Sequence, residues 1–189
     1  TPRSSSAASD VYKRQIVPAH QSMQSLNWER HRFNGGELMN KCLGIIGLGN
    51  VGHRVARYAK AFDMKVQAFD PYLADEVFER HGVQKVDWIT LLNTSDVITF
   101  HVPLNDETRG MISEMEIEKM KLGVILLNTA RGGVINETSL LNALNSGHVA
   151  AAGIDTWEVE PPRDNPFSQL PQVVMLSLIH ISEPTRLSA

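Results

Sequence analysis

The chain has 189 residues, of which 42% are hydrophobic and 21% are charged, and its formal net charge at pH 7 is -3. This is the composition of one ordinary globular domain, and the slight acidity argues against a nucleic-acid-binding surface. The single cysteine, Cys42, excludes an internal disulfide and a cysteine-rich zinc site, so we expect a cytoplasmic protein without a metal ion. No apolar run approaches the roughly 18 residues of a membrane-spanning helix, and we expect no membrane association.

The two ends differ in character from the middle of the chain. Residues 1–15 are rich in serine, alanine and arginine and lack hydrophobic periodicity. Both this segment and residues 177–189 resemble peptides translated from sequencing-adapter DNA. We therefore expect poorly ordered tails at 1–15 and 177–189, a connecting segment at 16–41 and one folded domain at 42–176, together a fragment of a longer protein.

A short apolar run at 43–46 predicts a buried strand, and three glycines follow it in the spacing G-x-G-x-x-G. Gly47 can make the tight turn off the strand, and Gly49 lets the backbone approach a pyrophosphate because it has no Cβ. Gly52 lets the next helix pack closely on the sheet. The spacing is typical of a dinucleotide-binding loop, although glycines also fall into it by chance in unrelated proteins.

A helix at 51–62 and a strand at 65–69 are predicted next. The amides of Asn50 and Val51, at the start of that helix, favour an anion such as a pyrophosphate. Asp70 ends the strand at the distance from the glycines that places an acid on the adenine ribose. Such an acid accepts hydrogen bonds from both ribose hydroxyls and repels a 2'-phosphate, so we predict NAD rather than NADP. The alternative is that Asp70 is only a turn residue.

The remaining middle of the chain alternates between predicted helices and strands. We expect helices at 74–80, 88–92, 114–121 and 136–146, and strands at 83–86, 97–101, 124–127, 150–154 and 173–175. Continuous hydrophobicity in such strands is typical of a sheet covered on both faces. We therefore predict an α/β fold with a doubly wound parallel sheet of the Rossmann type and right-handed crossovers.

In a sheet of this type, ligands bind at the carboxyl ends of the strands. This rule selects the loop at Gly47, then Asp70, the segments 101–103 and 128–131, and finally Asp155. We expect one cleft to collect all of them.

Arg131 is the candidate substrate-binding group among these positions. It follows an apolar strand and precedes Gly132 and Gly133, which keep side chains away from one side of the guanidinium. A planar carboxylate could then be bound in bidentate fashion. The alternative is an ordinary solvated surface arginine.

Three motifs stand in an order that is found in one family: the glycine loop, Asn128-Thr129-Ala130-Arg131-Gly132-Gly133, and Asp155 followed by Glu160-Pro161. In these motifs the chain resembles the D-isomer-specific 2-hydroxyacid dehydrogenases over about 16–175, and residues 28–38 are most similar to the phosphoglycerate dehydrogenase branch. The resemblance implies that Arg131 holds the substrate carboxylate, that Asp155 orients the nicotinamide carboxamide and that Glu160 pairs with a catalytic histidine. The further cofactor contacts that we predict are Asn50, Val51, Val102, Pro103, Thr129 and Ala130.

The resemblance also implies hydride transfer between NAD and a D-2-hydroxy acid, with 3-phosphoglycerate as one candidate, in a homodimer. The family's catalytic histidine follows the last strand in a Pro-His pair, which does not occur here after Met175. We interpret His180 as part of the tail and His101 as non-catalytic. Most of the substrate domain is missing too, so we expect weakened NAD binding and no dehydrogenase activity. The alternatives are an NAD-sensing, corepressor-like regulator and an inert fragment.

Overall fold

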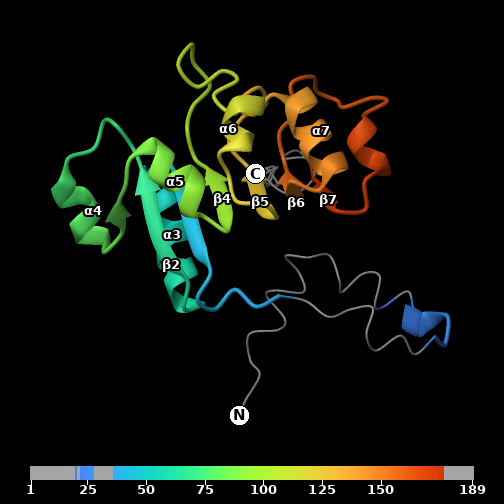
Figure 1. Ribbon diagram of the computed structural model, residues 1–189, viewed down its shortest axis with the longest axis horizontal. Helices are drawn as coiled ribbons and strands as arrows, with labels where there is room; N and C mark the ends of the chain where they lie inside the picture. Colours follow the sequence, from blue (N-terminus) through green and yellow to red (C-terminus); the bar gives the residue numbers. More distant parts are fainter. Residues whose placement is uncertain (1–19, 21, 28–35, 177–189) are drawn as a thin grey trace, which may run out of the picture.

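The computed structural model describes residues 20, 22–27 and 36–176 (Figure 1). Its strands are β1 Cys42–Ile46, β2 Lys65–Phe69, β3 Gln84–Lys85, β4 Val97–Phe100, β5 Val124–Asn128, β6 Val149–Ile154 and β7 Val173–Met175. Its helices are α3 Gly52–Ala61, α4 Asp75–His81, α5 Trp88–Thr94, α6 Glu114–Glu118, α7 Glu137–Ser146 and the 3-10 helix η1 Pro166–Gln169. The two predicted tails and part of the predicted connecting segment lie outside the described residues.

The strands form one seven-stranded sheet in the order β3-β2-β1-β4-β5-β6-β7, and all its pairings are parallel. Figure 1 shows α4 and α7 at opposite ends of this row of strands. The first strand, β1, lies inside the sheet. From β1 the chain continues through β2 to β3 at one end of the sheet, then returns beside β1 to form β4 and continues to β7 at the other end. This arrangement confirms the predicted doubly wound sheet, and it opens a ligand crevice beside β1, where the winding reverses.

Apolar side chains alternate between the two faces of the sheet. On β4, Ile98 and Phe100 are fully buried in a cluster with residues of α5, α6 and α7, whereas Val97 is buried in a second cluster with residues of α3 and α4. Each such burial contributes about 1.5–3 kcal/mol relative to an exposed side chain. Helices thus cover both faces, which is why most residues of β1, β4 and β5 are apolar. Within the described part of the chain, no helix combines the length and the apolar character needed to cross a membrane.

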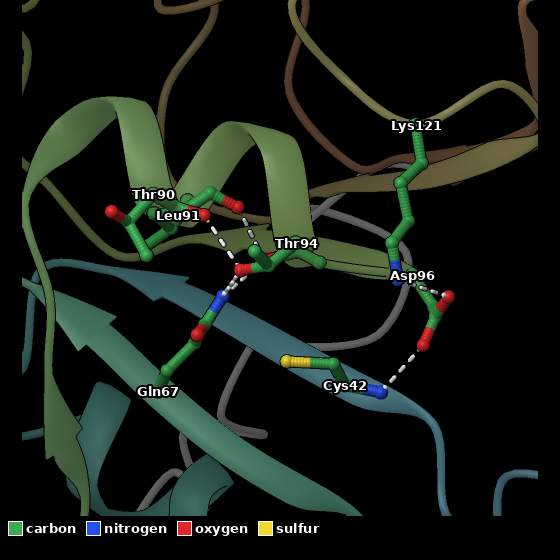
Figure 2. A network of polar contacts seen from close by, with 8 residues as sticks. Cys42, Gln67, Thr90, Leu91, Thr94, Asp96 and Lys121 are labelled. Atoms are coloured by element: carbon green, nitrogen blue, oxygen red, sulfur yellow. Dashed lines mark hydrogen bonds and ion pairs between the residues drawn. The ribbon is translucent and has the colours of Figure 1, made fainter.

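A buried polar network joins β2 to the end of α5 (Figure 2). Gln67 is 5% exposed, and its Nε2 donates to Thr94 Oγ1 at 2.7 Å and to Ser95 Oγ at 3.0 Å. Ser95 Oγ donates in turn to the Leu91 carbonyl oxygen at 2.7 Å. Gly44 lies against this network, since a Cβ there would be 2.2 Å from Ser95 Oγ. The buried amide is therefore paired, as a polar group in a core must be.

Asp96 connects the starts of three strands at the opposite edge from the glycine loop (Figure 2). The Cys42 backbone N–H donates to Asp96 Oδ2 at 2.7 Å, and Lys121 Nζ lies 3.0 Å from Oδ1. Burial alone would raise the pKa of Asp96, but the Cys42 amide and the Lys121 charge outweigh it and hold that pKa below its ordinary value. The ionised carboxylate is thus the form that the fold favours.

We expect Asp96→Asn to lower the free energy of unfolding at pH 7 by about 1–2 kcal/mol, because two charge-assisted hydrogen bonds become weaker ones. A carboxyl whose pKa is lower in the folded than in the unfolded state stabilises the fold above its unfolded pKa, and that contribution disappears as the pH falls through the folded pKa. Urea unfolding should therefore separate variant from wild type at pH 7 and much less below about pH 3. Asp75→Asn is the control, since Asp75 is an exposed acid paired with Lys85. An equal loss at both pH values would contradict this account.

Candidate functional site

The loop between β1 and α3 needs glycine at two places for its own packing. Gly47 has a φ of +89°, and a Cβ on it would lie 2.7 Å from the His101 carbonyl oxygen. A Cβ on Gly52 would lie 2.2 Å from the Gly47 carbonyl oxygen, so the first turn of α3 rests directly on the loop. Gly49 is different, because no atom lies within 4 Å of its Cβ position. Its outer side is open to a ligand.

The start of α3 carries backbone donors that nothing in the fold uses. Within the described residues, the N–H groups of Gly49, Asn50 and Val51 have no hydrogen-bond acceptor, and Val51, the N-cap, provides no side-chain cap. Such a helix end holds roughly half a positive charge and unpaired donors, which together favour an anion. The geometry at Asn50 and Val51 therefore suits a pyrophosphate.

Asp70 lies at the carboxyl end of β2, half-buried, and faces the same loop. Its Oδ2 accepts the Leu48 backbone N–H at 3.0 Å, and its Oδ1 accepts the Tyr72 backbone N–H at 3.1 Å. These bonds set the orientation of the carboxylate, while each oxygen keeps a second lone pair for a further donor. The turn interpretation and the ribose interpretation of Asp70 are thus compatible, since one oxygen orders the turn and both remain available to hydroxyls.

A cleft of about 340 Å³ opens beside the glycine loop. It is lined by Ile46, Gly47, Gly49, Phe69, Asp70, Pro71, Tyr72, His101, Val102, Pro103, Asn105, Glu107, Thr108 and Met111. Its walls are mainly apolar, with Asp70 among few polar groups, and its size falls in the range of small-molecule sites, which is about 300–1,000 Å³. The predicted residues Val102 and Pro103 form one wall opposite Asp70. This cleft suits the adenosine part of a dinucleotide.

His101 contributes to the same wall. Its Nε2 lies 3.0 Å from Thr99 Oγ1, and burial lowers the pKa of the imidazole. The interpretation of His101 as non-catalytic stays a prediction. His180 lies outside the described residues.

The loop after β5 is shaped by Asn128. Its side chain accepts the Ala130 backbone N–H at 3.1 Å and donates to the Arg131 carbonyl oxygen at 3.0 Å. Thr129 is exposed at the edge of the sheet and Ala130 is buried. Arg131 is exposed, and its Nη1 donates to the Ala130 carbonyl oxygen at 2.6 Å. Within the described residues its other guanidinium N–H groups are unpaired, as a carboxylate-binding arginine requires.

Gly132 couples this loop to the loop after β6. A Cβ on Gly132 would lie 1.9 Å from the Trp157 carbonyl oxygen and 2.8 Å from the Glu158 nitrogen. The two backbones therefore touch, and the position of Arg131 depends on that of Trp157.

We expect Gly132→Ala to push these two loops apart and to lower the free energy of unfolding by about 2–3 kcal/mol, because the clash is with backbone that cannot rotate away. The check is thermal unfolding followed by circular dichroism. Gly49→Ala serves as the control, since a Cβ at Gly49 meets no atom within 4 Å and its φ is not in the left-handed region. A Gly132 variant as stable as the wild type would show that the loops do not need this contact.

Asp155, which follows β6, has an unsatisfied acceptor. Its Oδ1 is buried and, in the described part of the chain, accepts no hydrogen bond; the same holds for Thr156 Oγ1. Burial, and secondly the charge of Glu160, raise the pKa of Asp155. Buried polar atoms are normally paired, so an orphaned one marks a place where a ligand donor fits. A carboxamide NH2 group is such a donor, which agrees with the role predicted for Asp155.

Glu160 and Glu158, two acids of the same loop, have different hydrogen-bond partners. Glu160 Oε1 accepts the Trp157 backbone N–H at 3.1 Å, and its side chain is exposed on the same loop as Asp155. Glu158 instead faces α7: its N–H donates to Glu137 Oε1 at 2.7 Å, and the Glu137 N–H donates to Glu158 Oε1 at 3.3 Å. Glu160 therefore remains the acid that is available to a histidine.

The predicted residues lie along one edge of the sheet, at the carboxyl ends of neighbouring strands. The expectation of one cleft that collects all of them is wrong in its extent. The 340 Å³ cleft contains the groups on β1, β2 and β4, whereas 128–131 and Asp155 lie outside its lining. Sequence reasoning missed Tyr72, Glu107 and Thr108 on that lining. Their only signals are the turn-forming residues around them, at 71 and at 105.

Residues 11–181 match the family described as D-isomer specific 2-hydroxyacid dehydrogenase, NAD binding domain. The chain belongs to this family. Its cofactor is accordingly NAD, and the residues at this edge of the sheet fit that group: unpaired amides for the diphosphate, an acid for the ribose and an unpaired acceptor at Asp155.

Relatives of this NAD-binding domain include several dehydrogenases and reductases. The chain is 48% identical over 174 residues to D-3-phosphoglycerate dehydrogenase of Archaeoglobus fulgidus, a match that covers 92% of this chain and 33% of that protein. It is 47% identical over 151 residues to hydroxypyruvate reductase of Thermotoga maritima, which covers 80% of this chain and 48% of that protein. Among solved structures, a glyoxylate reductase from Paecilomyes thermophila superposes with a TM-score of 0.78 at 36% identity, over 87% of this chain and 50% of that one. This domain thus spans about a third of the length of the curated phosphoglycerate dehydrogenases that it matches.

Proposed function

We propose that this chain is the cofactor-binding part of an oxidoreductase that transfers hydride between NAD and a D-2-hydroxy acid, with 3-phosphoglycerate as the first candidate substrate. The observation that carries the proposal is the unused row of amides at the start of α3, beside an apolar cleft that Asp70 borders. The identity to phosphoglycerate dehydrogenases supports the substrate class.

NAD, when bound, supplies the hydride acceptor. The cleft walls exclude water from the adenosine, and Asp70 accepts hydrogen bonds from the ribose hydroxyls. The amides of Gly49 to Val51 neutralise the diphosphate without a lysine. Further along the same edge, the free Oδ1 of Asp155 orients the carboxamide and so fixes which face of the nicotinamide is presented. The neighbouring Thr129 and Ala130 complete that end of the site.

Two side chains then serve the substrate. Arg131 holds the carboxylate of the 2-hydroxy acid. It also stabilises the negative charge that develops on the substrate oxygen at carbon 2. Glu160 accepts a hydrogen bond from a histidine that the rest of the enzyme provides, and its charge favours the imidazolium. The imidazolium donates a proton to the oxygen in reduction, and the neutral ring removes it in oxidation. Without that histidine, the chain is expected to bind cofactor without turnover.

The proposal is tested by titrating the purified chain with NADH and following nucleotide fluorescence. We expect saturable binding that NAD+ reverses and that NADPH reproduces only at higher concentration. Incubation with NAD+ and 3-phosphoglycerate should generate no NADH. Unchanged fluorescence up to millimolar NADH would contradict cofactor binding, and sustained turnover would contradict the inactive-fragment proposal.

A further inference from the structure

A side-chain contact crosses the open side of the cleft. Tyr72 belongs to the loop after β2 and Glu107 to the loop after β4, and both line the cleft. The Tyr72 hydroxyl donates a hydrogen bond to the Glu107 carboxylate, although the residues are 35 positions apart in the chain. Both side chains are exposed, with Tyr72 at 74%, so the contact lies on the solvent side of the cleft. It has no part in the core.

Both loops are held by bonds of their own, so that only side chains need to move. The Tyr72 backbone is tied to Asp70 Oδ1 at 3.1 Å. On the other side, Asn105 Oδ1 accepts the backbone N–H groups of Glu107 at 3.1 Å and of Thr108 at 2.9 Å. Thr108 Oγ1 further donates to the Pro103 carbonyl oxygen at 2.6 Å. Rotation of the two side chains can therefore open the cleft without rearranging its walls.

The chemistry of the pair suits this position. The hydrogen bond to Glu107 raises the pKa of Tyr72, which keeps the phenol protonated and able to donate. A tyrosine ring also presents an apolar face to a flat aromatic ligand while its hydroxyl stays in water. The pair can thus cover an adenine and still be solvated outside.

We propose that Tyr72 and Glu107 form a latch over the adenosine end of the cleft, which opens by side-chain rotation and re-forms over bound cofactor, so that it slows cofactor release. This inference rests on the proposed function, since it needs a nucleotide in the cleft. Because the contact is also formed without a nucleotide, the latch has to open for entry and for release, and release is the step that the experiment follows.

The test is displacement of NADH from the chain by excess NAD+, followed by stopped-flow fluorescence. We expect Tyr72→Phe and Glu107→Ala each to speed NADH dissociation by about fivefold, the factor that corresponds to one net hydrogen bond. The double variant should be no faster than the single variants, since both remove the same contact. Tyr58→Phe and Glu118→Ala are matched controls, because both residues are exposed and neither lines the cleft.

The measurements distinguish failure of the proposed latch from failure of the proposed function. If the wild-type chain binds NADH and the Tyr72 and Glu107 variants release it at the wild-type rate, the latch is wrong and the proposed function stands. The latch is equally wrong if the two effects add in the double variant, since the side chains would then act separately. If the wild-type chain binds no NADH, it is the proposed function that fails.

Discussion

Asp70→Ala is expected to weaken NAD binding by at least about tenfold, which corresponds to 1.4 kcal/mol, because hydrogen bonds from the ribose hydroxyls to an ionised acceptor are lost. The same change should narrow the preference for NADH over NADPH, since the charge that repels a 2'-phosphate disappears. The measurement is the dissociation constant of each nucleotide from fluorescence titration.

The alanine variant also leaves the Leu48 and Tyr72 amides without their acceptor, so a local collapse could imitate the effect. Asp70→Asn is therefore measured beside it, because asparagine keeps one acceptor oxygen and removes the charge. We expect this variant to keep one of the two backbone hydrogen bonds, to melt at a higher temperature than the alanine variant and to lose most of the discrimination against NADPH. Glu118→Gln controls for the change in net charge. Unchanged selectivity in both Asp70 variants would show that Asp70 is a turn residue only.

Substitution by alanine is expected to have different effects at Gly52 and at Gly49: the first should lower stability and the second should weaken NADH binding. Gly52→Ala should lower the free energy of unfolding by about 3 kcal/mol, because the new Cβ lies 2.2 Å from the Gly47 carbonyl oxygen and the helix must move. Gly49→Ala should leave stability unchanged, because a Cβ there meets no atom within 4 Å. It should nevertheless weaken NADH binding at least about tenfold, since the methyl group occupies the space through which the diphosphate approaches.

Thermal unfolding and NADH titration of both variants check this contrast. A Gly49 variant that binds NADH as tightly as the wild type would show that the diphosphate does not approach at this residue. A Gly52 variant that melts at the wild-type temperature would show that the helix does not need the close contact with Gly47. A Gly49 variant that is itself unstable would mean that the open space beside the loop does not exist in solution.

Strands and helices whose positions depend on the burial of apolar side chains could be predicted from the sequence. The predicted boundaries of β2 and β7 agree with the structure, because buried apolar residues such as Val66, Ala68 and Val173 hold these strands in the sheet. The helix predicted at 114–121 ends at Glu118 instead, because Lys119 caps it and the chain turns toward β5. The 3-10 helix η1 was not predicted. It is a single turn that begins where Asn165 accepts the Phe167 N–H, and one turn has no periodicity to detect.

The residues of the candidate site also differ in whether the sequence could predict them. Gly47 and Gly52 could be found because their backbone leaves no room for a side chain, and this requirement is visible in the residue type. Tyr72 and Glu107 could not, since they meet only when the loops after β2 and β4 are placed side by side by the sheet. The extent of the cleft depends on the same tertiary placement, which is why the single cleft expected for all the predicted residues was too large.

The proposed function places a nucleotide diphosphate on the backbone amides at the start of α3. An NMR titration of the ¹⁵N-labelled chain with NAD+ follows these amides one by one. We expect the amide signals of Gly49, Asn50 and Val51 to move most, while those of Gly123 and Gly147, in turns at the opposite edge of the sheet, stay in place. Saturable binding that leaves the signals of Gly49 to Val51 unmoved would contradict this placement of the diphosphate.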